Sequence, residues 1–356
     1  MADIQKQFED FHNNIKLKRF GENATLREKR DIIINKIKNG LKDKFEDDEN
    51  GVPSVEFIDQ GSYAVDLGII PEDGDYDIDE GAIFDLYIED YEDPTEMKKW
   101  IKEIMDGHTT VPPEIKRPCV TITYSIDEEP AYHVDLPVYA KSKYDDDLYL
   151  AWGKENSNSE NKYWEVADPI GLNDYIKNSF SGDDKKQFKR IVRYLKKWKD
   201  IRFTSSGNSQ PPSVGITIAA CEMFSPYSEY KSLTDKVEYV DLKALKNFVY
   251  NLKNSFTCEW DYEKEEYVYS IYLELPVKPN KDIFEKMTKN QMTNFYHELD
   301  KLYNALESAE NEPDPHTACK LLVEYFGDKF QVPEAKESRY TVGKSNAPSS
   351  FSALKE

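Results

Sequence analysis

The feature that most constrains the fold is a change of pattern partway along this 356-residue chain. Segments rich in Val, Ile, Thr and Tyr, with apolar residues at alternate positions, lie between residues 54 and 140 and are typical of strands. After residue 161 the apolar residues recur at helical spacing instead. The pattern predicts a mixed α/β lobe packed against a helical lobe, with a cleft between the two.

The boundaries of the expected elements follow from these patterns. Strands are predicted at residues 55–59, 75–88, 119–126 and 131–140, and helices at 25–45, 94–105, 188–200, 213–224 and 314–326 and around 295–306. We divide the chain into a first lobe at residues 1–160, with an N-terminal helix and the α/β core, and a helical lobe at residues 161–332. The polar, small-residue end at residues 333–356 is expected to be a flexible tail.

Charge and hydropathy restrict the class of protein. The formal net charge of −21 argues against a strong nucleic-acid binder, because neutralising phosphates requires Lys and Arg. The N-terminal sequence lacks the basic and apolar regions of a signal peptide, and no apolar stretch approaches the roughly 20 residues needed to span a bilayer. We therefore expect a soluble, cytoplasmic protein without membrane contact, and a monomer because of self-repulsion.

Acidic residues within two predicted strands are candidate metal ligands. Asp77 and Asp79 alternate in one strand and therefore point to the same face, although Asp75 forms an equally spaced pair with Asp77. Asp135 interrupts another, mostly apolar strand, where a carboxylate is costly to bury without a partner. Oxygen ligands suit Mg²⁺ or Mn²⁺. Because the chain contains 68 acidic residues, the Asp-x-Asp pattern alone is weak evidence.

A candidate phosphate-binding turn precedes the acidic strand. Gln60, Gly61 and Ser62 follow a predicted strand, and a glycine there lets backbone N–H groups approach a phosphate. Ser62 adds a hydroxyl donor. Together with the aspartates, this turn predicts phosphoryl transfer in which two metal ions, held by three carboxylates, contact a nucleoside triphosphate.

Three sequence stretches resemble the bacterial cGAS/DncV-like nucleotidyltransferases, a family within the polymerase-β-like superfamily. The stretches are QGS at 60–62, DIDEG at 77–81 and HVDLPVYA at 133–140. The resemblance selects Asp77, Asp79 and Asp135 as the catalytic, metal-binding set and leaves Asp75 outside it. It extends to RYLKKWKD at 193–200 and PPSVG at 211–215, which implies that Lys196 and Ser213 contact the donor triphosphate. Ser213 is also expected to cap the helix that it begins.

The resemblance implies a polymerase-β-like fold and an activity. The expected enzyme is a cyclic oligonucleotide synthase that joins two or three NTPs, ATP among them, and releases pyrophosphate in bacterial anti-phage signalling. An operon-encoded regulator and an effector activated by the cyclic nucleotide are the implied partners. Two alternatives remain open: a nucleotidyltransferase that modifies RNA or protein, and a catalytically silent binding scaffold. The joined bases, the ring size and the 2′–5′ or 3′–5′ linkage do not follow from the residues.

Overall fold

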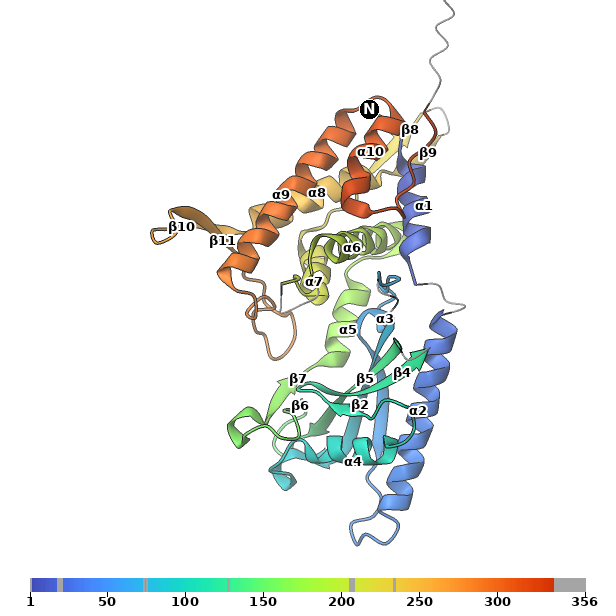
Figure 1. Ribbon diagram of the computed structural model, residues 1–356, viewed down its shortest axis with the longest axis vertical. Helices are drawn as coiled ribbons and strands as arrows, with labels where there is room; N and C mark the ends of the chain where they lie inside the picture. The colour runs from blue at the N-terminus through green and yellow to red at the C-terminus, as the bar shows by residue number, and fades with distance from the viewer. Residues whose placement is uncertain are drawn as a thin grey trace, which may run out of the picture.

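The computed structural model describes residues 2–17, 22–72, 74, 76–126, 129–204, 209–232 and 235–335. Figure 1 shows a sheet-containing part at the bottom of the view and a helical part at the top. This arrangement confirms the prediction, made from the sequence, of a mixed α/β lobe packed against a helical lobe. Of the predicted tail at residues 333–356, the part from residue 336 onward lies outside the described residues.

A mixed seven-stranded sheet organises the first part of the chain. Five strands are hydrogen-bonded in the order β1-β2-β5-β4-β3, and β6 joins β5 to β7. The β2–β5 pair is parallel, whereas the other pairs are antiparallel. The strands are β1 (Val55–Gln60), β2 (Tyr76–Tyr87), β3 (Glu114–Ile115), β4 (Cys119–Ile126), β5 (Glu129–Lys141), β6 (Leu148–Trp152) and β7 (Tyr163–Ala167).

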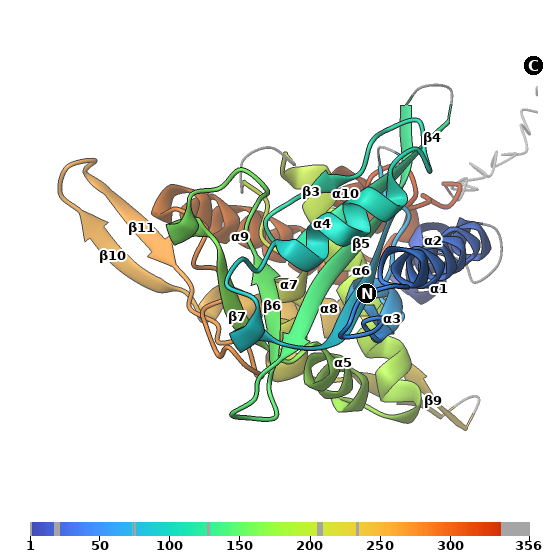
Figure 2. The ribbon, with the colours of Figure 1, turned by 90° about the horizontal axis from the view of Figure 1, so that it is seen from below.

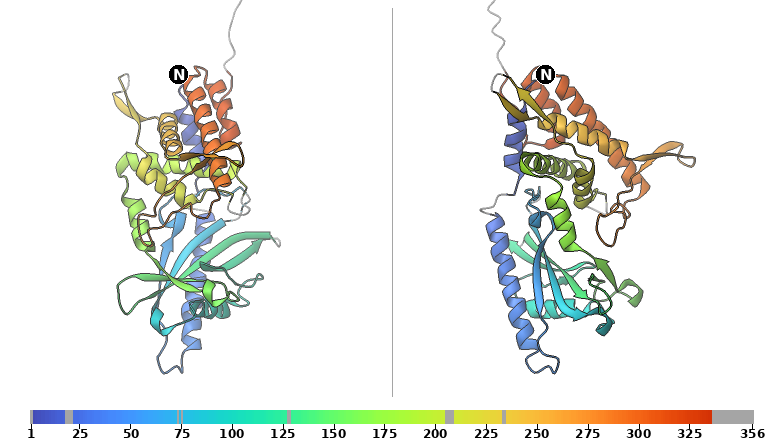
Figure 3. Two further views of the ribbon diagram at one scale, coloured as in Figure 1. Left: turned by 90° about the vertical axis from the view of Figure 1, so that its left-hand side faces the viewer. Right: turned by 180° about the vertical axis from the view of Figure 1, so that it is seen from behind.

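One face of this sheet is covered by α2 (Glu22–Lys44) and α4 (Glu96–Met105). Figure 3 shows α2 running along the outer side of the strands. Ile33 and Ile37 from α2, with Trp100 from α4, share an apolar cluster with alternate sheet residues such as Ile78 and Val134. Because side chains alternate along a strand, the residues between these apolar positions lie on the other face, toward the helical part.

The helical part is built around α6, which crosses the middle of the molecule in Figure 1. Its helices are α1 (Gln5–Ile15), α5 (Pro169–Asn178), α6 (Gly182–Arg202), α7 (Ser213–Met223), α8 (Asp241–Asn254), α9 (Lys289–Asn311) and α10 (Pro315–Phe326). Two hairpins accompany them, β8–β9 (Ser228–Lys231 and Lys236–Tyr239) and β10–β11 (Thr257–Asp261 and Glu266–Ser270). The β10–β11 hairpin projects away from the body in Figure 2.

The N-terminal residues belong to the helical part. Phe8 and Phe11 of α1 pack against Tyr194 of α6 and against Phe326 and Phe330 near the described C-terminal end. We expected residues 1–160 to form one unit, but α1 buries its apolar face in the second cluster because its nearest apolar partners are there. The division at residue 160 itself stays a prediction. Within the described ranges, no helix combines the length and the apolar character needed to cross a membrane.

Candidate functional site

The β2–β5 pair brings the three predicted aspartates to one face of the sheet. Asp79 and Asp135 are register partners on these parallel strands, and Asp77 lies two positions earlier on β2. Ile78 and Val134 point into the apolar cluster beneath α2 and α4. The aspartates therefore face the helical part, as strand alternation requires.

The Gly61–Ser62 turn lies directly beside this face. Residues Gly61–Ala64 form the short helix α3, which begins where β1 ends. Gly61 has φ of +63°, and a β-carbon there would lie 2.0 Å from Oδ2 of Asp79. This position therefore requires glycine for two reasons, the left-handed backbone and the adjacent carboxylate.

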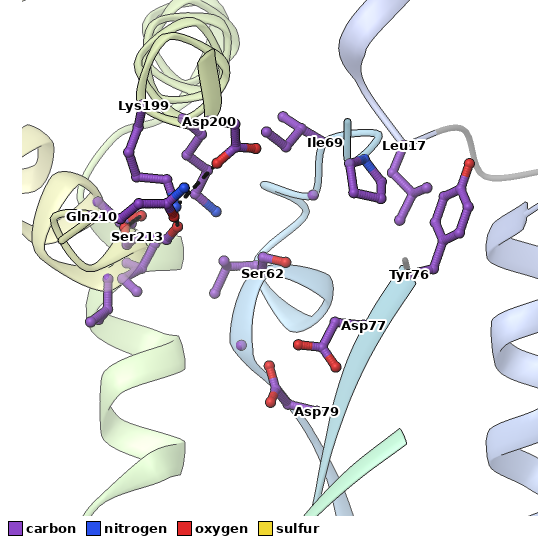
Figure 4. A pocket seen from close by; sticks show the side chains of 18 of the residues that line it. Leu17, Ser62, Ile69, Tyr76, Asp77, Asp79, Lys199, Asp200, Gln210 and Ser213 are labelled. Atoms are coloured by element: carbon purple, nitrogen blue, oxygen red, sulfur yellow. Dashed lines mark hydrogen bonds and ion pairs between the residues drawn. The ribbon is translucent and has the colours of Figure 1, made fainter. Parts of the chain in front are cut away.

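A cavity of about 870 Å³ separates the sheet face from α6 and α7. Its lining includes, from the sheet side, Gly61, Ser62, Asp77 and Asp79, and from the helical side Lys196, Lys199, Asp200, Gln210 and Ser213. Figure 4 shows Asp77, Asp79 and Ser62 on one wall, opposite Lys199 and Ser213. The carboxylates of Asp77 and Asp79 thus share one cavity with Lys196 and Lys199 from the helical side.

The helical wall contains a cation that sequence reasoning missed. Nζ of Lys199 donates a hydrogen bond to Oγ of Ser213 at 2.9 Å and lies 3.2 Å from Asp200 Oδ1. Lys196, the predicted triphosphate ligand, also lines the cavity, but its Nζ donates to the carbonyl of Leu67 at 3.2 Å. Lys199 follows Lys196 by three residues on the same helix, and this spacing is the signal that identifies it.

The electrostatics of the carboxylate wall are unfavourable without a cation. Burial, followed by the charges of Asp77 and Asp135, raises the pKa of Asp79 to about 7. On the opposite wall, burial lowers the pKa of Lys196 to about 7, with help from Lys199 and Arg193. Clustered carboxylates of this kind are stabilised when a divalent cation lies between them.

Two predicted site residues lie outside the cavity lining. Gln60 is buried, and its Nε2 donates to the hydroxyl of Tyr139 at 3.0 Å, so the expected phosphate contact of this side chain stays a prediction. Asp135 accepts a hydrogen bond from Oγ1 of Thr121, and its Oδ1 lies 4.0 Å from Nζ of Lys116. Among the described residues, no three His, Cys, Asp or Glu side chains are already arranged to hold a metal ion.

Ser213 differs in detail from its predicted role at the helix end. The N-cap of α7 is Pro212, and Ser213 is the first helical residue. Its hydroxyl oxygen accepts a hydrogen bond from Nζ of Lys199. The side chain is therefore held at the cavity wall by α6.

Comparisons with known proteins agree with this geometry. Residues 55–139 match the model of the cyclic GMP-AMP synthase DncV-like nucleotidyltransferase domain. A cyclic GMP-AMP synthase of Escherichia albertii is 28% identical over 204 residues, which cover 54% of this chain and 41% of that protein. The match thus spans less than half of the length of this curated relative.

Solved structures show the same fold over nearly the whole chain. Vibrio cholerae DncV, a cyclic AMP-GMP synthase, superposes with a TM-score of 0.68 at 17% identity and covers 93% of this chain and 98% of its own. CdnG of Bradyrhizobium diazoefficiens, solved with GTP, gives a TM-score of 0.64 at 14% identity, with coverage of 92% and 96%. The matched domain includes Gly61, Ser62 and all three aspartates. Residues 55–139 thus match the DncV-like nucleotidyltransferase domain, and nearly the whole chain shares the fold of the solved DncV and CdnG structures.

Proposed function

We propose that this chain is a divalent-metal-dependent synthase that joins two or three NTPs into a cyclic oligonucleotide and releases pyrophosphate. The observation that supports it most is the shared cavity, in which Ser62, Asp77 and Asp79 face Lys199 and Ser213. The similar V. cholerae protein is a cyclic AMP-GMP synthase, and the similar CdnG was solved with GTP. These likenesses favour purine NTPs, with ATP among them, as substrates.

The triphosphate of the donor would lie between the two walls. Ser62 and the backbone N–H groups of its turn would donate to phosphate oxygens from the sheet side. Lys199 and Ser213 would contact the same phosphates from the helical side, where a lysine acts as a point charge. Lys196, which lies deeper and already donates to Leu67, would contribute long-range charge.

The carboxylates fit a hard divalent cation in their chemistry. Asp77 and Asp79 would hold Mg²⁺ or Mn²⁺, and Asp135, adjacent in register to Asp79, would join them as the third ligand. Bound there, the metal would supply charge to the triphosphate and to the attacking hydroxyl. The raised pKa of Asp79 supports this assignment because it reflects a carboxylate that is buried beside those of Asp77 and Asp135, where a cation would offset the negative charge.

The chemistry requires two or three successive transfers in one cavity. In each, a ribose 2′- or 3′-hydroxyl oxygen forms a bond to the α-phosphorus of a triphosphate, which belongs to a second NTP at first and to the linear intermediate itself in the last transfer. The bond to pyrophosphate breaks, and the hydroxyl proton is released. The last transfer closes the ring. A cavity of about 870 Å³ supports this scheme, because it is near the upper end of the size of small-molecule sites and must hold two nucleotides.

The biological setting is proposed from the family alone. We place the enzyme in the cytoplasm, in anti-phage signalling, with an operon-encoded regulator and an effector that the cyclic product activates. A nucleotidyltransferase that modifies RNA or protein would leave a linear or macromolecule-linked product, and a silent scaffold would leave none.

The test is direct. Purified protein is incubated with Mg²⁺ and each labelled NTP, singly and mixed, and the products are treated with phosphatase and separated. We expect a nucleotide product that resists phosphatase and whose mass corresponds to a ring without terminal phosphates. A linear product, a labelled macromolecule or unchanged NTPs would contradict the proposal.

A further inference from the structure

We propose that Arg193 is a positioning residue that holds the phosphate-binding turn of the sheet lobe at a fixed place relative to the Lys199–Ser213 pair. It acts through residues 65–72, which we call the site loop. This loop connects α3 to the segment that enters β2, and it lies against α6. The inference rests on the proposed function for its catalytic consequence, although the clamp itself can be tested without activity.

Arg193 makes three hydrogen bonds to the site loop. Its Nη2 donates to the carbonyl of Asp66 at 2.6 Å and to Oδ1 of Asp66 at 3.1 Å, and its Nε donates to the carbonyl of Gly68 at 3.2 Å. Arg193 is 4% exposed. A planar guanidinium that spans two carbonyls fixes both distance and orientation, which a single ammonium cannot do.

Other residues of α6 hold the same loop. Lys189 pairs with Oδ2 of Asp66 at 2.7 Å, Lys196 donates to the carbonyl of Leu67 and Lys197 pairs with Glu72. Two apolar side chains of the loop, Val65 and Leu67, are buried in the cluster of the helical part rather than in that of the sheet. The loop therefore belongs to the sheet lobe by sequence and to the helical lobe by packing.

The clamp connects to both sides of the cavity. The backbone N–H of Leu67 donates to the carbonyl of Ser62 at 2.8 Å, so the loop holds the turn that carries this hydroxyl. Asp66 has φ of +53°, a left-handed conformation that is uncommon for a residue other than glycine. Nearer the C-terminal end of α6, Lys199 donates a hydrogen bond to Ser213. One helix thus positions the anchors on both walls.

Arg190 provides a matched control. It lies on the same helix and forms a comparable pair of bonds through Nε and Nη2, at 2.6 and 2.7 Å, to the buried Asp241 of α8. This pair joins two helices of the helical part and touches neither the site loop nor the cavity lining. Arg190→Lys therefore perturbs a buried ion pair of α6 without releasing the turn.

The experiment compares Arg193→Lys with Arg190→Lys by hydrogen–deuterium exchange and by steady-state kinetics on the full chain. In Arg193→Lys, amides in residues 61–72 should exchange about tenfold faster, and in Arg190→Lys they should keep their rates. With NTPs and Mg²⁺, Arg193→Lys should lower kcat by about tenfold to a hundredfold while KM changes little, because geometry rather than charge is lost. Arg190→Lys should keep both constants.

The outcomes separate the clamp from the proposed function. If wild-type protein forms no oligonucleotide, the proposed function fails and the exchange rates alone decide the clamp. Equal exchange in the two variants, or faster exchange with unchanged kcat, overturns the positioning role. If Arg193→Lys does not fold, Asp66→Asn at an exposed position tests the same contact. The exchange rates and kcat should then change in the same direction but by less. No change in either quantity overturns the positioning role.

Discussion

Gly61 and Asp79 are so close that a β-carbon at residue 61 would lie 2.0 Å from the carboxylate oxygen Oδ2. The two residues come from different elements, α3 and β2, and their contact places the Gly61–Ser62 turn against Asp79. A residue with a β-carbon at position 61 would therefore displace the side chain of Asp79 from its observed position.

Gly61→Ala should therefore displace the Asp79 carboxylate and reduce nucleotidyl transfer by about a hundredfold or more. The left-handed backbone adds about 1–2 kcal/mol of destabilisation. Turnover and urea unfolding, measured on the same preparation, separate these two effects.

Gly51→Ala is the matched control for this substitution. Gly51 has φ of +75°, and a β-carbon there would meet nothing within 4 Å. The variant should lose similar stability and keep full turnover. Equal turnover of the two variants would show that the crowding of Asp79 has no catalytic consequence.

Lys199→Gln should raise the KM for NTP by about tenfold, since a hydrogen bond to a charged group contributes roughly 1.5–3 kcal/mol. Lys186→Gln is the control, because Lys186 is an exposed residue of α6 that pairs only at the surface with Asp183, at 2.7 Å. An unchanged KM in Lys199→Gln, measured by initial rates across an NTP titration, argues against the contact with the triphosphate.

His12 should make the protein less stable in mild acid. Burial, followed by the charges of Arg193, Lys16 and Arg190, lowers the pKa of His12 to about 3. Its buried Nδ1 has no hydrogen-bond partner within the described part of the chain. Above the unfolded value of about 6.5 the residue is neutral in both states, so stability is lost only as the pH falls below 6.5 toward 3.

The measurement is urea unfolding at pH 7.5 and pH 5.0 for wild type and His12→Gln. Wild type should lose about 1–2 kcal/mol more than the variant between these pH values, a figure reduced for partial exposure of the ring. An identical loss in both proteins would assign the acid sensitivity to other groups.

Much of the sheet follows from local sequence because its long strands are rich in residues with high strand propensity, such as Val, Ile, Thr and Tyr. The predicted strand at 119–126 has the bounds observed for β4, and 75–88 differs from β2 by one residue at each end. The strands β6 and β7 were not predicted, since each has five residues and none or few of them are buried. Short edge strands of this kind depend on the neighbour that they pair with.

The site was predicted less completely than the fold, for identifiable reasons. The spacing of apolar residues predicts a single buried stripe along α6 with Lys196 at the edge of that stripe. In the structure, however, every residue from Ile191 to Lys199 is buried. Because the helix is surrounded by the site loop and by other helices, the stripe cannot tell which lysine reaches the cavity. Likewise, the bond between Gln60 and Tyr139 joins residues 79 positions apart, which no local pattern shows.

The most direct test of the central claim is product formation by Asp79→Asn beside Asp85→Asn. Both residues lie on β2, but Asp85 is exposed and pairs at 2.8 Å with Lys141, away from the cavity lining. With Mg²⁺ and mixed NTPs, mass spectrometry after phosphatase treatment should find cyclic oligonucleotide from wild type and Asp85→Asn and none from Asp79→Asn. Cyclic product from Asp79→Asn at the wild-type rate would contradict the account.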